Sequence, residues 1–385
     1  MDLQRKKNLR ALAKLMNRQN VTSIPVTDQL LDCFDAVITP EENDFLLKMG
    51  GERFNFAQAC ANTNLPIDQA REFLVCMLKK GLLWSEYDEG AEYFRLAPIL
   101  VGWFEIFLSD GQETRDKKEF ARRVDKLFNF WGQFNRFPLR NILNMRTGKG
   151  TPHKQIYSAT GKPQKKSVTV QLNRNVEASD TCIYPAKTVF ELIEKYGGSN
   201  DIAVVHCFCR QWRKMVDEPC SFDYPAESCI VIGPRTKYVV NYGIARYISQ
   251  SESLELIELL QHKGAVHQVF HEREDINLPE IAICNCCWDC CGILGSYNRG
   301  VLPFFVKSHF IAEIVDSSIC NGCGKCVKYC PVRALTLKNG TVELNQKLCI
   351  GCGQCELKCP QQIFSLRNDE RDVILPLLKK YQARL

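Results

Sequence analysis

The sequence lacks a long apolar run and an N-terminal secretory pattern. Its longest apolar stretch, residues 96–108, is interrupted by Glu105 and is shorter than the roughly 20 residues that a membrane-spanning helix requires. The first residues, MDLQRKKNLRALAKLMNRQ, carry scattered charges and no apolar segment with a cleavage site. We therefore expect a cytoplasmic protein that does not span the membrane, in a reducing compartment where clustered cysteines seldom form disulfides.

Cofactor and catalytic signatures are also scarce. The segment GIARYIS lacks the complete glycine pattern of a dinucleotide site, so we find no flavin or nicotinamide motif. In RTGKGTP a proline stands where the helix of a phosphate-binding loop would begin. The sequence offers no nucleophile with a matching base, and the catalytic residues, if any, stay unknown.

Cysteine, in contrast, is abundant, with 21 in 385 residues. Four stand alone, at Cys33, Cys60, Cys76 and Cys182, and the other seventeen lie between Cys207 and Cys359. In a reducing compartment, clustered cysteines more often bind metal or do redox chemistry than form structural bridges. The second half of the chain is therefore expected to carry the chemistry.

Two segments near the C-terminus repeat each other: SSICNGCGKCVKYCPVRALTL and QKLCIGCGQCELKCPQQIFSL. Each contains C-x2-C-x2-C-x3-C-P, in which three cysteines bind one [4Fe-4S] cluster and the fourth reaches the other cluster. This rule predicts two clusters with crossed ligands. The first would take Cys320, Cys323, Cys326 and Cys359, and the second Cys349, Cys352, Cys355 and Cys330.

The residues around these cysteines fit the same interpretation. Glycines let the backbone approach the cluster sulfides, and prolines turn the chain after each crossing ligand; these are Gly322, Gly324, Gly351, Gly353, Pro331 and Pro360. ALTLKNGTVELN predicts a hairpin with an Asn339-Gly340 turn. The module resembles the bacterial-type two-cluster ferredoxin. A zinc site built from the same cysteines would not explain the duplication.

Before this module the pattern predicts a mixed α/β domain. PAKTVFELIEKYGG and SQSESLELIELLQHKG have helix start and stop signals, while DIAVVHCFC, SCIVIGP, GAVHQVFH and EIAICNCC are strand-like. The cysteines lie at ends of predicted strands, where folds of this kind usually place ligand sites.

These cysteines form two groups along the chain: Cys207, Cys209, Cys220 and Cys229, then Cys284, Cys286, Cys287, Cys290 and Cys291. Nine thiols in one small domain would repel one another once ionised unless a metal centre took up the charge. We expect one or two further iron–sulfur clusters here, with a structural zinc or merely buried cysteines as alternatives. His206 and His267 are less favoured as ligands.

The C-x-C-R, CNCCWDCC and two-cluster motifs together resemble multi-cluster ferredoxin-like iron–sulfur proteins of anaerobes, over about residues 180–366. The resemblance implies electron transfer with a partner that differs from case to case. Some relatives carry another cysteine where Trp288 and Asp289 stand, so the ligand assignment of the middle cysteines stays open.

The N-terminal part predicts helices from Thr39, over 56–63 and over 66–80, followed by a hairpin of LLWSEY and AEYFRLA. This pattern is similar to the winged-helix fold. The charges disfavour DNA binding, because Asp68, Glu72, Glu86, Asp88 and Glu92 would repel phosphates. We expect a protein-docking domain.

Two basic segments complete the sequence. Residues 1–22 predict a basic amphipathic helix that packs on its own domain, with peripheral membrane contact as the alternative. Residues 136–174 contain nine Lys and Arg residues and no Asp or Glu. Such a connector could steer an acidic redox partner.

The expected chain is thus an α+β multidomain protein. Its segments would be 1–22, the winged-helix-like domain 23–110, a helix and connector 111–178, the cysteine-rich α/β domain 179–316, the ferredoxin-like domain 317–368 and a C-terminal helix 369–385. We expect it to relay low-potential electrons as a partner or subunit of an oxidoreductase. The alternatives are an iron–sulfur redox-sensing DNA-binding regulator and a cluster-dependent reductase with its active site in the middle domain.

Overall fold

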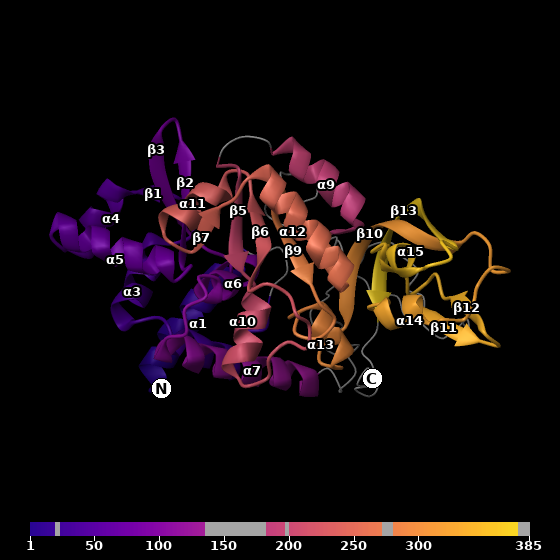
Figure 1. Cartoon of the computed structure of the whole chain (residues 1–385). Coiled ribbons are helices and arrows are strands. Elements are labelled where there is room, and N and C mark those ends of the chain that lie inside the picture. The colour runs from indigo at the N-terminus through magenta and orange to yellow at the C-terminus, as the bar shows by residue number, and fades with distance from the viewer. Residues whose placement is uncertain (20–23, 135–181, 197–199, 272–279, 376–385) are drawn as a thin grey trace, which may run out of the picture.

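The structure is a computed structural model that describes residues 1–19, 24–134, 182–196, 200–271 and 280–375. The whole basic connector, residues 136–174, lies outside the described residues. Among the described residues, no helix is long and apolar enough to cross a membrane. Figure 1 shows three regions in chain order, from the N-terminal helices through a large sheet to the cysteine-rich repeat at the opposite end.

The N-terminal region consists of five helices and a small sheet. The helices are α1 (Leu3–Asn17), α2 (Asp28–Asp35), α3 (Pro40–Met49), α4 (Phe56–Thr63) and α5 (Ile67–Lys79). The strands β1 (Phe54–Asn55), β2 (Leu83–Asp88) and β3 (Ala91–Leu96) pair in the order β1-β3-β2. A capping box of Thr39 and Glu42 starts α3, and the helices and hairpin expected between 39 and 96 are all present.

Helix α1 packs on its own domain. Its apolar residues Leu9, Leu12 and Met16 are fully buried, whereas Leu3 is 88% exposed. Asp2 caps the helix, and Arg5 pairs with Asp35 at 3.0 Å. The apolar face that the sequence offers to a membrane is therefore used within the fold.

An irregular turn, η1 (Ile99–Trp103), with Val101 at positive φ, leads into the middle region. It is followed by α6 (Phe104–Leu108) and α7 (Arg115–Phe134). That region holds an eight-stranded sheet in the order β13-β10-β4-β8-β9-β6-β5-β7. In chain order its strands are β4 (Cys182–Tyr184), β5 (Ile202–His206), β6 (Glu227–Ile232), β7 (Ala245–Tyr247), β8 (Val266–His271), β9 (Glu280–Cys286), β10 (Phe304–Ile314) and β13 (Phe364–Leu375). Neighbouring strands are antiparallel except for β10 and β4, which run parallel.

Helices cover both faces of this sheet. On one face, α9 (Ala186–Lys195) and α12 (Gln250–Lys263) bury Val189, Ile193 and Ile257 against the strands. On the other face lie α10 (Phe208–Met215) and the N-terminal region (Figure 1). The short helices α11 (Arg235–Asn241) and α13 (Leu294–Asn298) connect strands. The mixed α/β frame predicted from the sequence is present.

The N-terminal and middle regions share one hydrophobic core. Leu12 and Trp103 belong to the same buried cluster as Val205 and Trp212. The hydroxyl of Tyr238 on α11 donates to the carbonyl of Leu78, at 2.8 Å. The N-terminal region is therefore built into the fold rather than attached to it by a linker.

The cysteine repeat is inserted into the large sheet. Strands β10 and β13 pair over ten registered positions, from Phe304 with Leu375 to Ile314 with Phe364, and the repeat occupies the chain between them. It contains α14 (Lys325–Tyr329), β11 (Leu335–Lys338), β12 (Thr341–Leu344) and α15 (Gln354–Lys358). The predicted hairpin is present, with both Asn339 and Gly340 at positive φ.

The helix predicted over 369–385 is wrong for 369–375, because β13 continues to Leu375. Its alternating pattern places Val373 and Leu375 in the core, and pairing with β10 satisfies its backbone. Residues 376–385 lie outside the described residues. The repeat also does not form a separate domain with boundaries at 317 and 368, because the strands that flank it, β10 and β13, belong to the large sheet.

Candidate iron–sulfur sites

The structure brings the eight cysteines of the repeat together in two sets of four. The outer set, Cys320, Cys323, Cys326 and Cys359, surrounds a small cavity together with Leu337, Val342 and Ile363. The inner set, Cys330, Cys349, Cys352 and Cys355, surrounds a second cavity. In each set the crossing cysteine comes from the other half of the repeat, as the sequence rule predicts.

Glycines allow the cluster loops to approach other backbone closely. Gly351 has a φ of +67°, and a Cβ placed there would lie 2.2 Å from the carbonyl oxygen of Phe310. At Gly322 a Cβ would lie 2.6 Å from the carbonyl oxygen of Gly340. These positions require glycine for both conformation and space.

The chemistry of the two cavities fits an iron–sulfur cluster. The Ala312 N–H lies 3.4 Å from the Cys349 sulfur, and the Ala334 N–H lies 3.2 Å from the Cys330 sulfur, where they stabilise thiolates. Burial raises the pKa of Cys326 to about 11 and raises those of Cys352 and Cys355 further above the ordinary range. Such thiols ionise when a metal takes up their charge.

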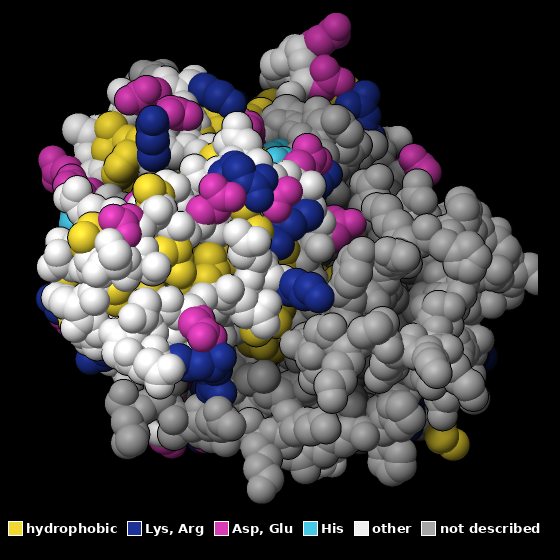
Figure 2. Space-filling model, turned by 90° about the vertical axis from the view of Figure 1, so that its right-hand side faces the viewer, with side chains coloured by type: hydrophobic (Ala, Val, Ile, Leu, Met, Phe, Trp, Pro, Cys, Tyr) yellow, Lys and Arg dark blue, Asp and Glu magenta, His cyan; other side chains and the backbone are white. Residues whose placement is uncertain are grey.

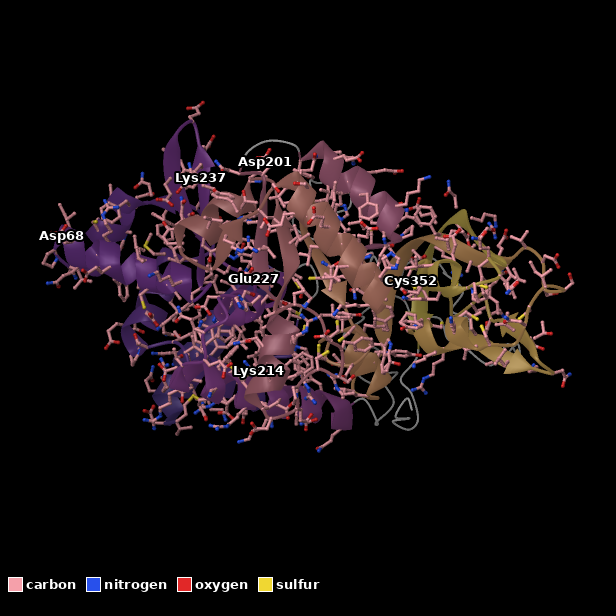
Figure 3. All side chains as sticks on the ribbon, in the orientation of Figure 1. Asp68, Asp201, Lys214, Glu227, Lys237 and Cys352 are labelled. Atoms are coloured by element: carbon pink, nitrogen blue, oxygen red, sulfur yellow. The ribbon has the colours of Figure 1, made fainter. Side chains whose placement is uncertain are left out.

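The inner set lies against the large sheet. Gly353 packs on Pro185, and the side-chain amide of Gln354 donates to the carbonyl of Ala265 at 2.8 Å. Figure 3 shows Cys352 on the side of the repeat that faces the sheet. The outer set lies beside the β11–β12 hairpin at the far end of the molecule (Figure 1), and Cys323 is exposed.

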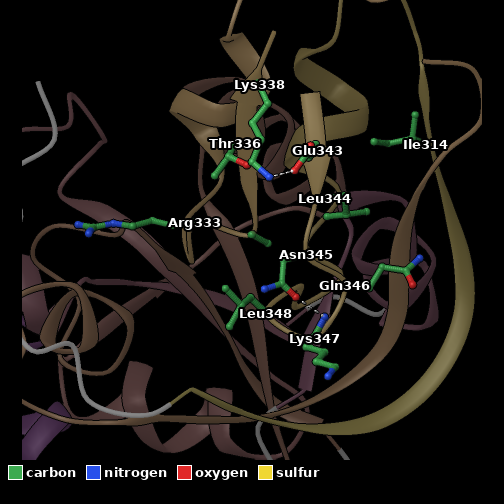
Figure 4. Close-up of a pocket in the computed structure, with 11 residues that line it drawn as sticks. Ile314, Arg333, Thr336, Lys338, Glu343, Leu344, Asn345, Gln346, Lys347 and Leu348 are labelled. Carbon is green, nitrogen blue, oxygen red and sulfur yellow. Dashed lines mark hydrogen bonds and ion pairs between the residues drawn. The ribbon is translucent and has the colours of Figure 1, made fainter. Parts of the chain in front are cut away.

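Beside the inner set, an open hollow lies along the β11–β12 hairpin (Figure 4). Its rim carries Arg333, Lys347 and the ion pair of Lys338 with Glu343, at 2.5 Å. Ala334 and Leu344 line both this hollow and the inner cavity. One layer of side chains thus separates the inner set from this part of the surface.

Six of the nine middle-domain thiols form a continuous chain, which we call the six-thiol group. Side-chain interactions link Cys284, Cys229, Cys207, Cys209, Cys291 and Cys286 in that order. The sheet explains part of this assembly, because Ile230 of β6 pairs with Ile283 of β9 and so places the adjoining Cys229 and Cys284 side by side. The N–H of Gly292 donates to the Cys209 sulfur at 3.0 Å.

The other three thiols form a separate three-thiol group of Cys220, Cys287 and Cys290. Their sulfur atoms all lie within 4.8 Å of one another, with 3.4 Å between Cys220 and Cys287 and 3.0 Å between Cys287 and Cys290. Neighbouring thiols lower the pKa of Cys220, as they do those of Cys207 and Cys291 in the six-thiol group. The two sequence groups are therefore both divided between the two structural groups.

Arg210 supplies positive charge between the two groups. Burial lowers its pKa, but the nearby charges of Cys207, Cys290, Cys229 and Cys220 raise it well above the ordinary value. One nitrogen, Nη1, donates to the carbonyl of Pro225 and the hydroxyl of Ser228, while Nε and Nη2 are buried without a protein partner among the described residues. A buried cation with vacant donors fits a site that carries negative charge.

The two histidines weighed as ligands lie elsewhere in the structure. The His267 Nδ1 lies 2.6 Å from the Asn285 Oδ1 inside the sheet, and burial lowers the His267 pKa to about 4. The Asn285 amide in turn donates to the carbonyl of Ser228. The His206 backbone bonds to Ser109. Sequence analysis missed the role of Arg210, although its position in the C-x-C-R motif is a signal for it.

Comparison with known proteins supports an iron–sulfur domain at the repeat. Residues 312–360 match the family described as the 4Fe-4S dicluster domain. No curated protein and no solved structure matches the chain. The match covers all eight cysteines of both sets and ends at Pro360, before β13 begins. This chain therefore contains a ferredoxin-type iron–sulfur domain that binds 4Fe-4S cofactors.

Proposed function

We propose that this protein relays electrons through three iron–sulfur sites in a row: the six-thiol group, the inner set and the outer set. A bound [4Fe-4S] cluster takes up or releases one electron, at a potential set by net charge, hydrogen bonds to sulfur and exposure. In this account the chain is a partner or subunit of a larger oxidoreductase in a reducing, cytoplasmic compartment. The observation that carries it is the order of these cysteine groups along the molecule.

A single hydrophobic cluster connects the first two of these sites. Cys291 and Cys286 of the six-thiol group belong to the same cluster as Cys330, Cys349 and Cys355 of the inner set. Helix α13, which follows Cys291, also contacts the residue next to Cys330, because the Asn298 amide donates to the carbonyl of Pro331 at 3.0 Å. Apolar packing between the groups excludes water and holds their separation fixed.

The outer set lies where a partner can reach it. Exposed apolar side chains surround this end, with Val315 69%, Ile319 50% and Leu337 41% exposed. Figure 2 looks onto this end of the molecule and shows apolar side chains among acidic and basic ones. A small apolar patch with mixed charges around it is typical of transient redox encounters.

The N-terminal region is proposed to be winged-helix-like and to scaffold the middle domain. Its hairpin contacts α11: the Tyr242 hydroxyl donates to Glu92 at 2.9 Å, and Arg235 pairs with Glu86 at 3.5 Å. A hairpin engaged in this way is not available to a DNA groove. The DNA-binding regulator is therefore the less favoured function, and no observation favours a substrate-reducing site.

The experiment that tests the relay uses a redox enzyme captured with the protein from native cells under anaerobic conditions. We expect Ile319→Glu and Val315→Glu to slow electron transfer to that enzyme at least tenfold, because a buried carboxylate would oppose docking. The electron paramagnetic resonance (EPR) spectrum of the reduced clusters should not change.

Ile67→Glu is the matched control, because Ile67 is 67% exposed but lies on α5, at the other end of the molecule. Its transfer rate should equal that of the wild type. The proposal fails if the outer-end variants transfer electrons at the wild-type rate, or if no redox enzyme accompanies the protein.

A further inference from the structure

We propose that the three-thiol group is a separate site for a single zinc ion. The three thiolates would fill three of the four coordination positions of the ion and leave the fourth open to an external ligand. This inference is independent of the electron relay. It assigns Cys220, Cys287 and Cys290 a role different from the cluster ligation that the sequence suggests.

The spacing of the sulfur atoms carries the proposal. A tetrahedral zinc site with metal–sulfur bonds of about 2.3 Å places its sulfurs about 3.8 Å apart. The three sulfurs here lie within 4.8 Å of one another, so they can share one ion after small adjustments. In a [4Fe-4S] cluster each thiolate binds a different iron, so the cysteine sulfurs lie farther apart than they do around a single ion.

The other cysteine groups in the same structure make the contrast clear. The inner and outer sets each surround a cavity. In the six-thiol group, among the described residues, no three sulfurs lie close enough to share one ion. Only the three-thiol group, among the described residues, closes into a triangle that fits one ion.

The surrounding structure holds this triangle in place. Cys287 and Cys290 have the C-x2-C spacing common in zinc sites, and the Cys290 N–H donates to the Cys287 sulfur at 3.1 Å. The loop of Cys220 is fixed to them, because the Ser221 N–H donates to the Asp289 carboxylate at 2.7 Å. These hydrogen bonds therefore hold the thiols of both loops close together in the folded protein.

The environment suits a thiolate-bound cation with restricted access to water. Phe222 lies edge-on to Trp288, with ring centroids 4.9 Å apart, and also packs on Tyr224. Cys287 and Cys290 are 1% and 2% exposed, whereas Cys220 is partly exposed at the rim. Three thiolates and a divalent zinc ion leave one negative charge, which Arg210 offsets from the side of Cys290 and Cys220. The open coordination position would lie on the side of the partly exposed Cys220. Zinc sites with three protein ligands likewise keep a fourth position for water or substrate.

The test is metal and sulfide analysis of the full chain with its clusters reconstituted in the presence of Zn²⁺. We expect about one zinc ion per chain in the wild type and at least a tenfold loss of zinc in Cys287→Ser/Cys290→Ser. Iron and acid-labile sulfide should stay at the wild-type level in that variant. Cys207→Ser/Cys229→Ser is the matched control and should lose iron and sulfide while it keeps zinc.

Loss of iron and sulfide from Cys287→Ser/Cys290→Ser would overturn the proposal, since the three thiols would then be cluster ligands. Zinc content unaffected by that variant would overturn it too. If the double variant is insoluble, Cys220→Ser at the rim gives the same comparison. In each variant, the EPR signal of the inner and outer sets shows that the protein has folded. Loss of that EPR signal in the wild type would contradict the relay and not the zinc site.

Discussion

At the scale of single residues, Gly351 ties the inner set to the sheet. Gly351→Ala should destabilise the protein by several kcal/mol, because the new Cβ would meet the Phe310 carbonyl at 2.2 Å in addition to a conformational cost of about 1–2 kcal/mol. Gly324→Ala has a similar φ of +69° but meets only a flexible Leu337 methyl at 3.3 Å. Thermal unfolding of the two reconstituted variants measures the difference, and equal losses would show that the backbone contact is unimportant.

Arg210 should set the reduction potential of the six-thiol site. Arg210→Met removes a positive charge near Cys207 and Cys229, which disfavours the added electron and should lower the potential by on the order of 60 mV, about 1.4 kcal/mol. Arg210→Lys keeps the charge and should shift the potential less. An EPR-monitored redox titration checks this order, and a potential unchanged in Arg210→Met would rule out the assigned role.

Residue spacing alone predicted how the two ferredoxin-type sets assemble, because each run of cysteines forms one local loop and only one ligand crosses over. The division of the middle thiols could not be predicted in this way. Cys286 and Cys287 are adjacent in sequence but belong to different groups. That outcome depends on the pairing of β6 with β9 and on the loop of Cys220, which are tertiary features.

At the scale of elements, the segment after η1 contains a carboxyl group with a shifted pKa. Burial raises the pKa of Glu105 from 4.5 to about 6, although the Gly102 N–H donates to its carboxylate at 2.9 Å. The folded state therefore binds more protons than the unfolded state between these pH values, and the free energy of unfolding falls as pH rises through them.

Glu105→Gln should remove this pH dependence and stabilise the protein by about 1–2 kcal/mol at pH 7, since glutamine can still accept the Gly102 hydrogen bond. At pH 4 the two proteins should be nearly equal in stability. Urea unfolding at both pH values measures the effect. Glu113→Gln, whose pKa is lowered by Lys214, is a control that should not stabilise at pH 7.

Local signals predicted most elements well, since capping boxes, glycine stops and an Asn-Gly turn act over a few residues. They failed at the C-terminus, where the pairing of β13 with β10 decides the structure. A strand whose paired residues lie 50 to 71 positions earlier, across an inserted domain, has no local signature. The same long-range pairing explains why the ferredoxin-type domain appeared as an appended unit in the sequence.

At the scale of the whole molecule, the shared core predicts that the N-terminal and middle regions unfold together. Leu12→Ala in α1 removes a fully buried side chain and should cost about 2–5 kcal/mol. Leu3→Ala, at an 88% exposed position of the same helix, should cost almost nothing.

Far-ultraviolet circular dichroism and cluster absorbance should shift to the same lower melting temperature in Leu12→Ala. A wild-type transition in the absorbance, with only the dichroism shifted, would mean that the regions are independent. The proposed scaffolding role of the N-terminal region depends on this shared core, because a scaffold must be rigidly joined to the sites that it supports.

The proposed relay requires a further iron–sulfur site in the six-thiol group beside the two ferredoxin-type sets. Iron and acid-labile sulfide per chain test it most directly, in the wild type and in Cys229→Ser/Cys284→Ser. We expect about twelve or more irons in the wild type, with sulfide to match, and about eight in the variant. About eight irons in both proteins would contradict the account and leave only the two sets of the repeat.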